Sequence, residues 1–281
     1  MFGKILFCTD FSEHATAAFH CIRKLPGLHS MILLHAVDAT HSGKRGWTYD
    51  PEIENARLIL DELKLETDSA GITGKARLEV ITGGDIPGAI LGIAAQEDPD
   101  LIVMGARGRG LVQGLLFGSV SSSVLRHSRH DVLIYREKAG GRPCPDILSK
   151  VLFPTDFSPP AEAALKELGE LPGVGTVALL HVVTRGETHD EIQASVAEAK
   201  DGLREISEQM GSGDMKMTTH VRIGNPVEEI LRVAMEEEAG LIFMSSHGEN
   251  MVQTIFLGST TGEVVRSAGC PVLVARAKHK S

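Results

Sequence analysis

The chain has 281 residues and a formal net charge of −9, with 42% hydrophobic and 23% charged residues. This length accommodates two domains of ordinary size, and the composition excludes a disordered or fibrous class. No apolar run approaches the roughly 20 residues that span a bilayer, no signal-like segment precedes the first apolar run, and no dense Lys/Arg stripe is present. We therefore expect a cytoplasmic protein that binds neither membranes nor nucleic acid.

The sequence contains one pattern twice. Residues 4–12 read KILFCTDFS and residues 150–158 read KVLFPTDFS, an offset of 146 positions. In both copies a short apolar run ends at Thr-Asp, and a serine suited to a helix N-cap follows. Apolar residues then recur at i, i+3, i+4 and i+7. Each copy is therefore predicted to begin with a strand and a helix.

Strands and helices continue to alternate through each copy. The expected strands are 5–8, 31–37, 76–81, 101–104 and 132–135 in the first copy, and, after the KVLF run, 177–183, 217–223, 241–244 and 272–275 in the second. Five strands alternating with four helices, twice, predict an α/β protein of two tandem doubly wound domains, each with a five-stranded parallel sheet.

A Gly/Pro-rich linker at 137–149 separates the two predicted domains, 1–138 and 148–281. The offset between the copies falls from 146 to 140 along the repeat, so the second copy is six residues shorter. We expect this loss in the connection between the second and third strands, because such loops tolerate changes in length.

Glycines follow the fourth strand of each copy. The first copy has Gly105-x2-Gly108-x9-Gly118-Ser119, and the second has Gly248 and then Gly258-Ser259. Glycines let backbone N–H groups approach phosphate oxygens, and a helix N-terminus adds unpaired donors. In an open parallel sheet this loop meets the Thr-Asp segment where the winding reverses. Turn-forming glycines are the alternative, but the full spacing and its recurrence favour a phosphate site.

Together, the TDFS segment, the Leu-Leu-His of the second strand and the G-x2-G-x9-G-S pattern resemble the universal stress protein family, over both halves. The resemblance implies a tandem member with a Rossmann-like fold similar to that of the adenine nucleotide alpha hydrolases. It also implies ATP or AMP as the bound cofactor, with Mg²⁺ accompanying a triphosphate. In ATP-binding members the glycine motif holds the phosphates and ribose, and the Asp after the first strand and the residue after Leu-Leu-His border the nucleotide.

Carried onto the first copy, the resemblance implies a nucleotide site made of Thr9, Asp10, Ala36, Met104, Gly105, Arg107, Gly108, Gly118, Ser119 and Val120. In the second copy it implies a site made of Thr155, Asp156, Val182, Met244, Ser245, Gly248, Gly258, Ser259 and Thr260.

The two predicted sites differ in chemistry. Ser245 stands where the first glycine of the motif should be; its Cβ could narrow the approach beneath the ribose, or its hydroxyl could supply a hydrogen bond. Arg107 and Arg109 of the first loop correspond to His247 and Glu249 of the second. Because cations favour a polyphosphate and a carboxylate opposes it, we expect the first site to bind ATP in preference to the second.

Other polar side chains and the thiols have structural interpretations. Asp10 and Asp156 could stiffen the turn before a helix, a role compatible with bordering a nucleotide. His35 and His181 have no second ligand at a recognisable spacing, so we expect structural histidines and no metal site. The cysteines form no CxxC pair, and we expect buried, reduced thiols at Cys8, Cys21, Cys144 and Cys270.

Three classes of function fit these patterns: a stress or signalling regulator whose nucleotide occupancy changes partner binding, a slow ATP-hydrolysing or adenylyl-transferring enzyme, and a nucleotide-free scaffold. HIGH and GxxxxGK[ST] motifs are absent and no general base accompanies a nucleophile, so we favour the regulator and assign no catalytic residue. In the resembled family the final strands pair across a two-fold axis. This implies a pseudo-dimer of the two halves and, between chains, a homodimer.

Overall fold

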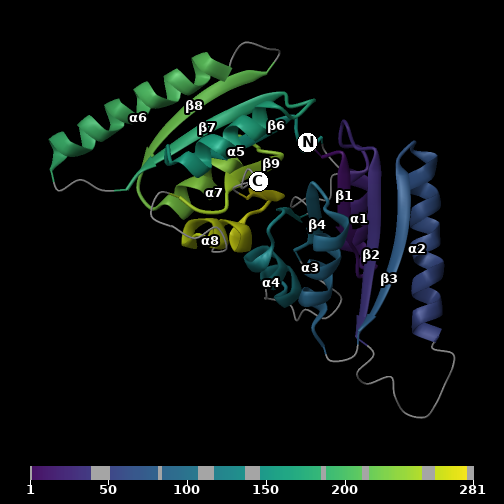
Figure 1. The fold of residues 1–281 in the computed structure, drawn as a ribbon. Helices are drawn as coiled ribbons and strands as arrows, with labels where there is room; N and C mark the ends of the chain where they lie inside the picture. The colour runs from purple at the N-terminus through teal and green to yellow at the C-terminus, as the bar shows by residue number, and fades with distance from the viewer. Residues whose placement is uncertain are drawn as a thin grey trace. The chain divides into compact units, whose positions relative to one another are not determined.

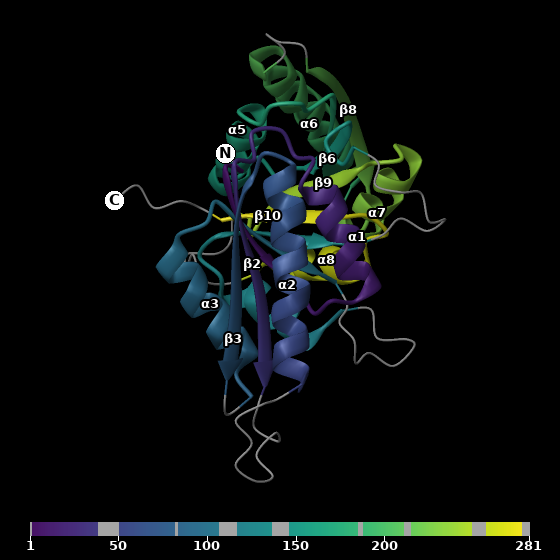
Figure 2. The ribbon, with the colours of Figure 1, turned by 90° about the vertical axis from the view of Figure 1, so that its right-hand side faces the viewer.

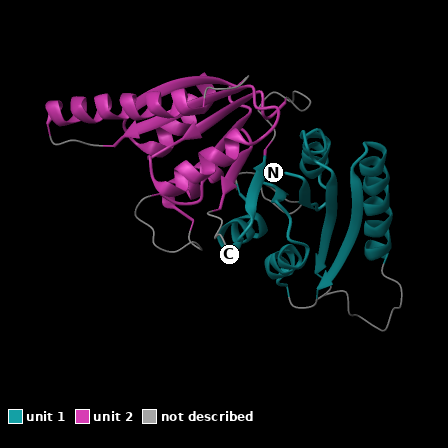
Figure 3. Cartoon of the chain, turned by 45° about the horizontal axis from the view of Figure 1, so that its top comes forward, with its two compact units in different colours: residues 1–135 teal, residues 136–281 magenta. Residues whose placement is uncertain are grey.

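The computed structural model describes residues 2–38, 51–81, 84–106, 117–136, 146–184, 188–210, 215–248 and 257–276. The chain divides into two compact units, Met1–Tyr135 and Arg136–Ser281 (Figure 3). Each unit alternates strands and helices along the chain (Figure 1).

The first unit contains β1 (Lys4–Cys8), α1 (Glu13–Ile22), β2 (Ser30–Asp38), α2 (Pro51–Ser69), β3 (Thr73–Ile81), α3 (Ile86–Glu97), β4 (Leu101–Gly105), α4 (Ser119–His127) and β5 (Asp131–Tyr135). The second unit contains β6 (Lys150–Pro154), α5 (Pro159–Gly169), β7 (Thr176–Val183), α6 (His189–Met210), β8 (Lys216–Ile223), α7 (Pro226–Glu236), β9 (Leu241–Ser245), α8 (Ser259–Ser267) and β10 (Val272–Ala275).

The strands of each unit are parallel and doubly wound. Their order is β3-β2-β1-β4-β5 in the first unit and β8-β7-β6-β9-β10 in the second. The winding reverses between β1 and β4, and again between β6 and β9. This confirms the predicted fold class. It also fixes where a ligand of such a sheet is expected, at the carboxyl ends of these central strands.

Helices cover both faces of the first sheet. Figure 2 shows α1 and α2 on one face and α3 on the other, where α3 contacts α4. Strands enclosed in this way lose the alternation of polar and apolar residues, and β4 buries four consecutive residues from Leu101. None of the helices in the described ranges combines the length and apolar character needed to cross a membrane.

Paired aromatic rings anchor both cores, but from different elements. Phe7 of β1 meets Phe19 of α1 edge-on at 5.8 Å between ring centroids. The equivalent Phe153 of β6 instead meets Phe243 of β9 at 5.9 Å. All four rings are nearly or fully buried. The partner ring therefore comes from a helix in the first unit and from a strand in the second. At the position of Phe19 in α1, α5 carries the smaller Leu165.

The strand registers show where the second copy is shorter. Ser30 and Thr176 hold the same register position on β2 and β7, 146 positions apart. Thr73 on β3 and Lys216 on β8 are 143 apart, and Leu101 on β4 and Leu241 on β9 are 140 apart. Three residues are thus lost before the third strand and three after it. The prediction that all six residues are lost between the second and third strands is therefore wrong in part. The connection between the third and fourth strands also lies outside the sheet, so it tolerates a change in length as well.

The cysteines are not all alike. Cys8 and Cys270 are buried and free, whereas Cys21 is disulfide-bonded. Cys144 lies outside the described residues. The expectation of reduced thiols is therefore wrong for Cys21, since a disulfide depends on proximity in space and not on spacing in sequence.

Candidate functional site

Side-chain hydrogen bonds define the turn after β1. Thr9 Oγ1 accepts from the Phe11 N–H at 3.0 Å, and Asp10 Oδ1 accepts from the Ser12 N–H at 3.1 Å and the Ser12 hydroxyl at 2.7 Å. Ser12 Oγ caps α1 by accepting from the Ala15 N–H at 3.2 Å. These bonds hold Phe11 at φ +60°, a left-handed conformation that is unfavourable for a residue with a Cβ. Asp10 thus has the predicted turn-stiffening role.

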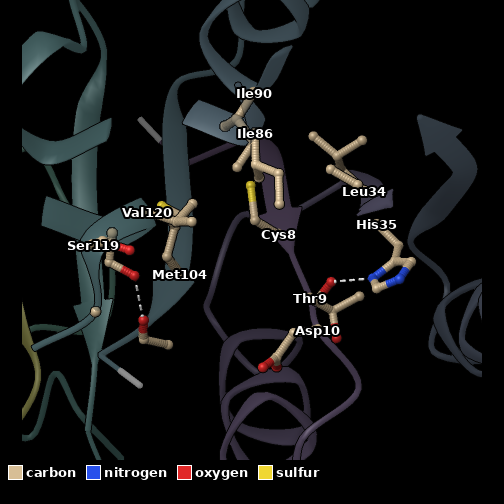
Figure 4. A pocket seen from close by; sticks show the side chains of 14 residues that line it. Cys8, Thr9, Asp10, Leu34, His35, Ile86, Ile90, Met104, Ser119 and Val120 are labelled. Atoms are coloured by element: carbon tan, nitrogen blue, oxygen red, sulfur yellow. Dashed lines mark hydrogen bonds between the residues drawn. The ribbon is translucent and has the colours of Figure 1, made fainter. Parts of the chain in front are cut away.

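His35 fastens this turn to β2. Its Nδ1 lies 2.7 Å from the Thr9 carbonyl oxygen (Figure 4). Its ring stacks on that of Phe11, with 4.2 Å between the ring centroids. A carbonyl only accepts, so Nδ1 carries the proton. His35 is a structural histidine, as expected. Within the described part of the chain, no group of three or more His, Cys, Asp and Glu side chains could hold a metal ion.

The second unit repeats this network after β6. Asp156 Oδ1 accepts from the Ser158 N–H at 3.1 Å and the Ser158 hydroxyl at 2.5 Å, and Phe157 has φ +61°. His181 Nδ1 donates to the Thr155 carbonyl oxygen at 2.9 Å, and its ring stacks on Phe157 at 4.6 Å. Each unit therefore carries an Asp carboxylate in the same turn, at the carboxyl end of its first strand.

The end of β4 and the start of α4 are held together. The Gly118 N–H donates to the Ala106 carbonyl oxygen at 2.9 Å, and Ser121 Oγ donates to the Gly105 carbonyl oxygen at 2.8 Å. Equivalent bonds in the second unit join Gly258 to Ser246 at 2.8 Å and Thr261 to Ser245 at 3.0 Å. These ends of the predicted glycine loop therefore meet in both units.

Arg107, Arg109, Gly108 and Glu249 lie outside the described residues.

The helices that follow these loops lack side-chain caps. Side chains of Ser12, Asp85, Ser158 and Asn225 cap α1, α3, α5 and α7. Glycines occupy the N-cap of α4 and α8, and no side-chain cap bond is made there. The first N–H groups of these two helices thus receive no acceptor from a cap side chain, which suits them to an external anion.

Neither backbone conformation nor packing requires a glycine at the start of α4. Gly118 has φ −74° and ψ 147°, close to the −70° and 160° of the capping Ser12. A Cβ on Gly118 would meet only the Ala106 carbonyl oxygen at 3.6 Å and Ser121 Oγ at 3.8 Å among described atoms, both ordinary contacts. The fold would accept a side chain here, so the glycine is consistent with space kept for a ligand.

A cavity of about 320 Å³ opens at the carboxyl ends of β1 and β4 (Figure 4). The predicted site residues that line it are Thr9, Asp10, Ala36, Met104, Gly105, Gly118, Ser119 and Val120. Sequence reasoning missed other apolar residues of its wall, among them Leu34, Ile86 and Ile90. The two isoleucines come from the first turns of α3, which the Gly/Pro turn before that helix could have indicated.

The matching cavity of the second unit has a volume of about 460 Å³. All nine predicted residues line it: Thr155, Asp156, Val182, Met244, Ser245, Gly248, Gly258, Ser259 and Thr260. Ser245 Oγ donates to the His247 carbonyl oxygen at 3.0 Å. Its hydroxyl is therefore engaged within its own loop.

His247 gives the second cavity a different electrostatic character. It lines the cavity but is only 5% exposed, and its Nδ1 lies 2.9 Å from Ser246 Oγ. Burial lowers the pKa of His247, the positive charge of Arg276 lowers it further, and Asp156 opposes the shift. His247 is thus neutral at pH 7 and adds no positive charge to this cavity.

Gly248 has a packing role as well as a place in the predicted motif. A Cβ on Gly248 would overlap Asp156 Oδ2, so the glycine is what lets the carboxylate approach the loop backbone. This contact brings together the Thr-Asp turn after β6 and the glycine loop after β9, the two segments predicted to form the second site.

An open parallel sheet with a cavity at its winding reversal defines each unit as a doubly wound α/β domain. The model of the universal stress protein family matches residues 1–136 and again residues 148–276. The chain therefore belongs to the universal stress protein family, as a tandem member with two such domains.

Individual relatives agree with this assignment. Universal stress protein Rv1996 of Mycobacterium tuberculosis is 30% identical over 234 residues, covering 76% of this chain and 70% of that protein. Universal stress protein MJ0577 of Methanocaldococcus jannaschii is 30% identical over 155 residues, covering 46% of this chain and 96% of that protein. The crystal structure of a universal stress protein from Archaeoglobus fulgidus superposes with a TM-score of 0.72 at 27% identity, covering 99% of this chain and 97% of that one.

Proposed function

We propose that this universal stress protein binds adenine nucleotides, ATP or AMP, in the cavities of its two units, and that occupancy regulates its binding to a partner in a stress-response or signalling role. The observation that carries the proposal is the pair of uncapped helix N-termini at Gly118 and Gly258, each in the wall of a cavity. Unpaired N–H groups and the positive end of the helix dipole favour phosphate at such a place.

The remaining walls fit the other parts of a nucleotide. In the first cavity Leu34, Ile86 and Met104 form an apolar surface suited to a base. Thr9, Asp10 and Ser119 supply oxygens suited to ribose hydroxyls and phosphate. Mg²⁺ would accompany a triphosphate and not a protein-built metal site, since these residues offer few carboxylates.

The first site is the better candidate for ATP. Ser245 adds a side chain to the second loop, where the first unit has Gly105, and His247 is held neutral beside the Asp156 carboxylate. Both cavities have an Asp carboxylate, so the ranking depends on the loops: the first loop has Arg107 and Arg109 in its sequence, whereas the second has the neutral His247 and Glu249. This ranking supports ATP in the first site and an AMP-like ligand, or a weaker one, in the second.

Two measurements test the proposal. Freshly purified protein is denatured, and the released small molecules are identified by chromatography. Stripped protein is then titrated with ATP and AMP by calorimetry. We expect adenine nucleotide in the first experiment and saturable binding in the second. Absence of both would leave the fold without its proposed ligand and favour a nucleotide-free scaffold.

Assembly and location are part of the same proposal. The resemblance supports pairing of the final strands, with the two halves forming a pseudo-dimer and two chains forming a homodimer in the cytoplasm. Light scattering coupled to size-exclusion chromatography measures the mass directly. A mass of one chain across the micromolar range would contradict the homodimer.

A further inference from the structure

A wide groove separates α5 and α6 of the second unit, away from the helix N-terminus that the proposed function uses. Its volume is about 1120 Å³, beyond the range of about 300–1,000 Å³ typical of small-molecule sites. Its apolar lining residues are Phe157, Leu165, Ala199, Ile206, Met210 and Met215. Its acidic lining residues are Glu162, Glu170, Glu198, Asp201 and Glu205, and Lys166 is the single Lys or Arg among the described lining residues.

The first unit shows how the same space is closed. Arg23 of α1 lies over the Phe19 ring at 5.5 Å, and its guanidinium pairs with Glu66 of α2 at 3.0 Å. The Phe19 ring, the Arg23 guanidinium and the Glu66 carboxylate thus connect α1 to α2.

The second unit lacks all three of these side chains. The offset of 146 places Leu165 and Gly169 where α1 has Phe19 and Arg23. The offset of 143, which aligns the buried pairs Ala56 with Ala199 and Leu60 with Leu203, places Gln209 where α2 has Glu66. A ring, a cation and its carboxylate have become a smaller apolar residue, a glycine and an amide. The groove therefore results from specific substitutions.

Gly202 widens the groove further. It stands in the interior of the 22-residue helix α6, where Ile59 stands in α2, and glycine is unfavourable in a helix interior. A Cβ on Gly202 would lie 3.1 Å from Cε1 of Phe157, so an isoleucine would enter the groove. Ile206 and Met210, further along the same face, are only half-buried. An apolar floor is thus left uncovered.

We propose that this groove docks a cationic amphipathic helix of a protein partner. An apolar stripe on such a helix would lie on the floor, and flanking Lys or Arg side chains would meet the carboxylates of both rims. Glu162 stands on α5 and Glu170 at its C-cap, and Glu198 and Glu205 stand on α6, all exposed. Asp201 pairs with Arg204 of its own helix at 2.9 Å, but both side chains are more than 60% exposed, so this pair is weak.

The side chains of the floor suit a helical partner. Methionines adapt to differently shaped apolar side chains, and two of them, Met210 and Met215, line the groove. The inference does not depend on nucleotide binding, because none of the uncapped amides of α8 takes part. It goes beyond the proposed function by stating which surface meets the partner and what chemistry that partner has.

The test uses a fluorescein-labelled synthetic peptide of leucine and lysine, with leucines at i, i+3, i+4 and i+7, and anisotropy as the readout on the full chain. Glu198→Gln with Glu205→Gln removes two groove charges, and we expect about fivefold weaker binding. Asp190→Asn with Glu208→Gln removes two charges from the same helix outside the groove, and we expect less than about twofold change.

A second pair of variants tests the apolar floor. Gly202→Ile installs the residue of the first unit, and we expect about tenfold weaker binding as the groove fills. Gly92→Ile on α3 is the matched control, because that helix glycine is exposed and no described atom lies within 4 Å of an added Cβ. We expect unchanged peptide affinity for it. Circular dichroism and melting temperature report whether either variant remains folded.

Three results would overturn the inference. If both double variants weakened peptide binding equally, the peptide would be responding to the general negative charge of the protein and not to the groove. Unchanged affinity in a folded Gly202→Ile variant would mean that the peptide binds elsewhere. Self-association that is abolished by Gly202→Ile, with no competition from the peptide, would assign the groove to a second copy of this chain.

Discussion

Gly118→Asp should stabilise the first unit and weaken its ligand binding at the same time. The backbone of Gly118 already has the conformation of an N-cap, and a Cβ there makes only ordinary contacts. An aspartate at this position could accept from the first N–H groups of α4, as Ser12 accepts from the Ala15 N–H at 3.2 Å. The side chain would then occupy the donors that we assign to phosphate.

Both effects can be estimated. Replacing glycine by aspartate at an N-cap gains a few tenths of a kcal/mol, and a charge at the helix N-terminus adds about 0.3–1 kcal/mol, so we expect about 0.5–1 kcal/mol of added stability. A carboxylate about 4 Å from a phosphate charge repels it by about 4 kcal/mol at an effective dielectric constant of about 20. Solvent in the open cavity screens about half of this repulsion, which leaves about 2 kcal/mol. The dissociation constant should therefore rise about 30-fold.

The assay combines thermal unfolding without nucleotide and calorimetric titration with ATP. We expect the melting temperature of the first unit to rise by about 2–4 °C while affinity for ATP at the first site falls about 30-fold. Gly258→Asp is the matched control, since α8 is also uncapped behind a glycine. Full ATP affinity in a folded Gly118→Asp protein would show that phosphate does not bind at this helix end. A lower melting temperature would show that the capping argument is wrong.

Three further predictions follow from the same structure. Gly118→Asp should remove more ATP binding than Gly258→Asp in paired titrations, and an equal or reversed loss would contradict the ranking of the two sites. Ser12→Ala should lower unfolding free energy by about 1–2 kcal/mol in urea, because it removes the cap of α1 and a bond to Asp10; no change would contradict the role of this turn. Burial lowers the pKa of His247, so below about pH 6.5 the unfolded state binds more protons than the folded one and stability falls with falling pH. His247→Gln should flatten that part of the stability curve measured by thermal unfolding, and an unchanged slope would mean that another group titrates.

Local patterns in the sequence were enough to predict the strands and the fold class. Apolar runs such as Leu101–Gly105 are continuous because both faces of a central parallel strand are buried. Ser12 and Ser158 were recognisable as caps because capping depends on neighbours a few residues away. The shortening of the second copy was placed only in part, since its positions depend on strand register.

The candidate sites were predicted less completely, because they too depend on contacts between elements that are far apart in the sequence. Residues next to strand ends, such as Asp10 and Gly118, were found because the doubly wound topology brings those ends together. Ile86 and Ile90 were missed because α3 reaches the cavity only after it has packed on the sheet. The neutral state of His247 depends on burial, which sequence spacing does not reveal.

The sequence by itself determined a duplicated α/β scaffold and the residue types at the ends of its central strands. Only the tertiary structure decided that α4 and α8 begin without side-chain caps in the walls of cavities, and that a groove separates α5 from α6. The physical reason is the distance along the chain over which the determining interactions act. Hydrophobic periodicity and caps are set by residues a few positions apart, whereas a cavity or an open seam depends on side chains from elements far apart in the chain, such as Gly169 and Gln209.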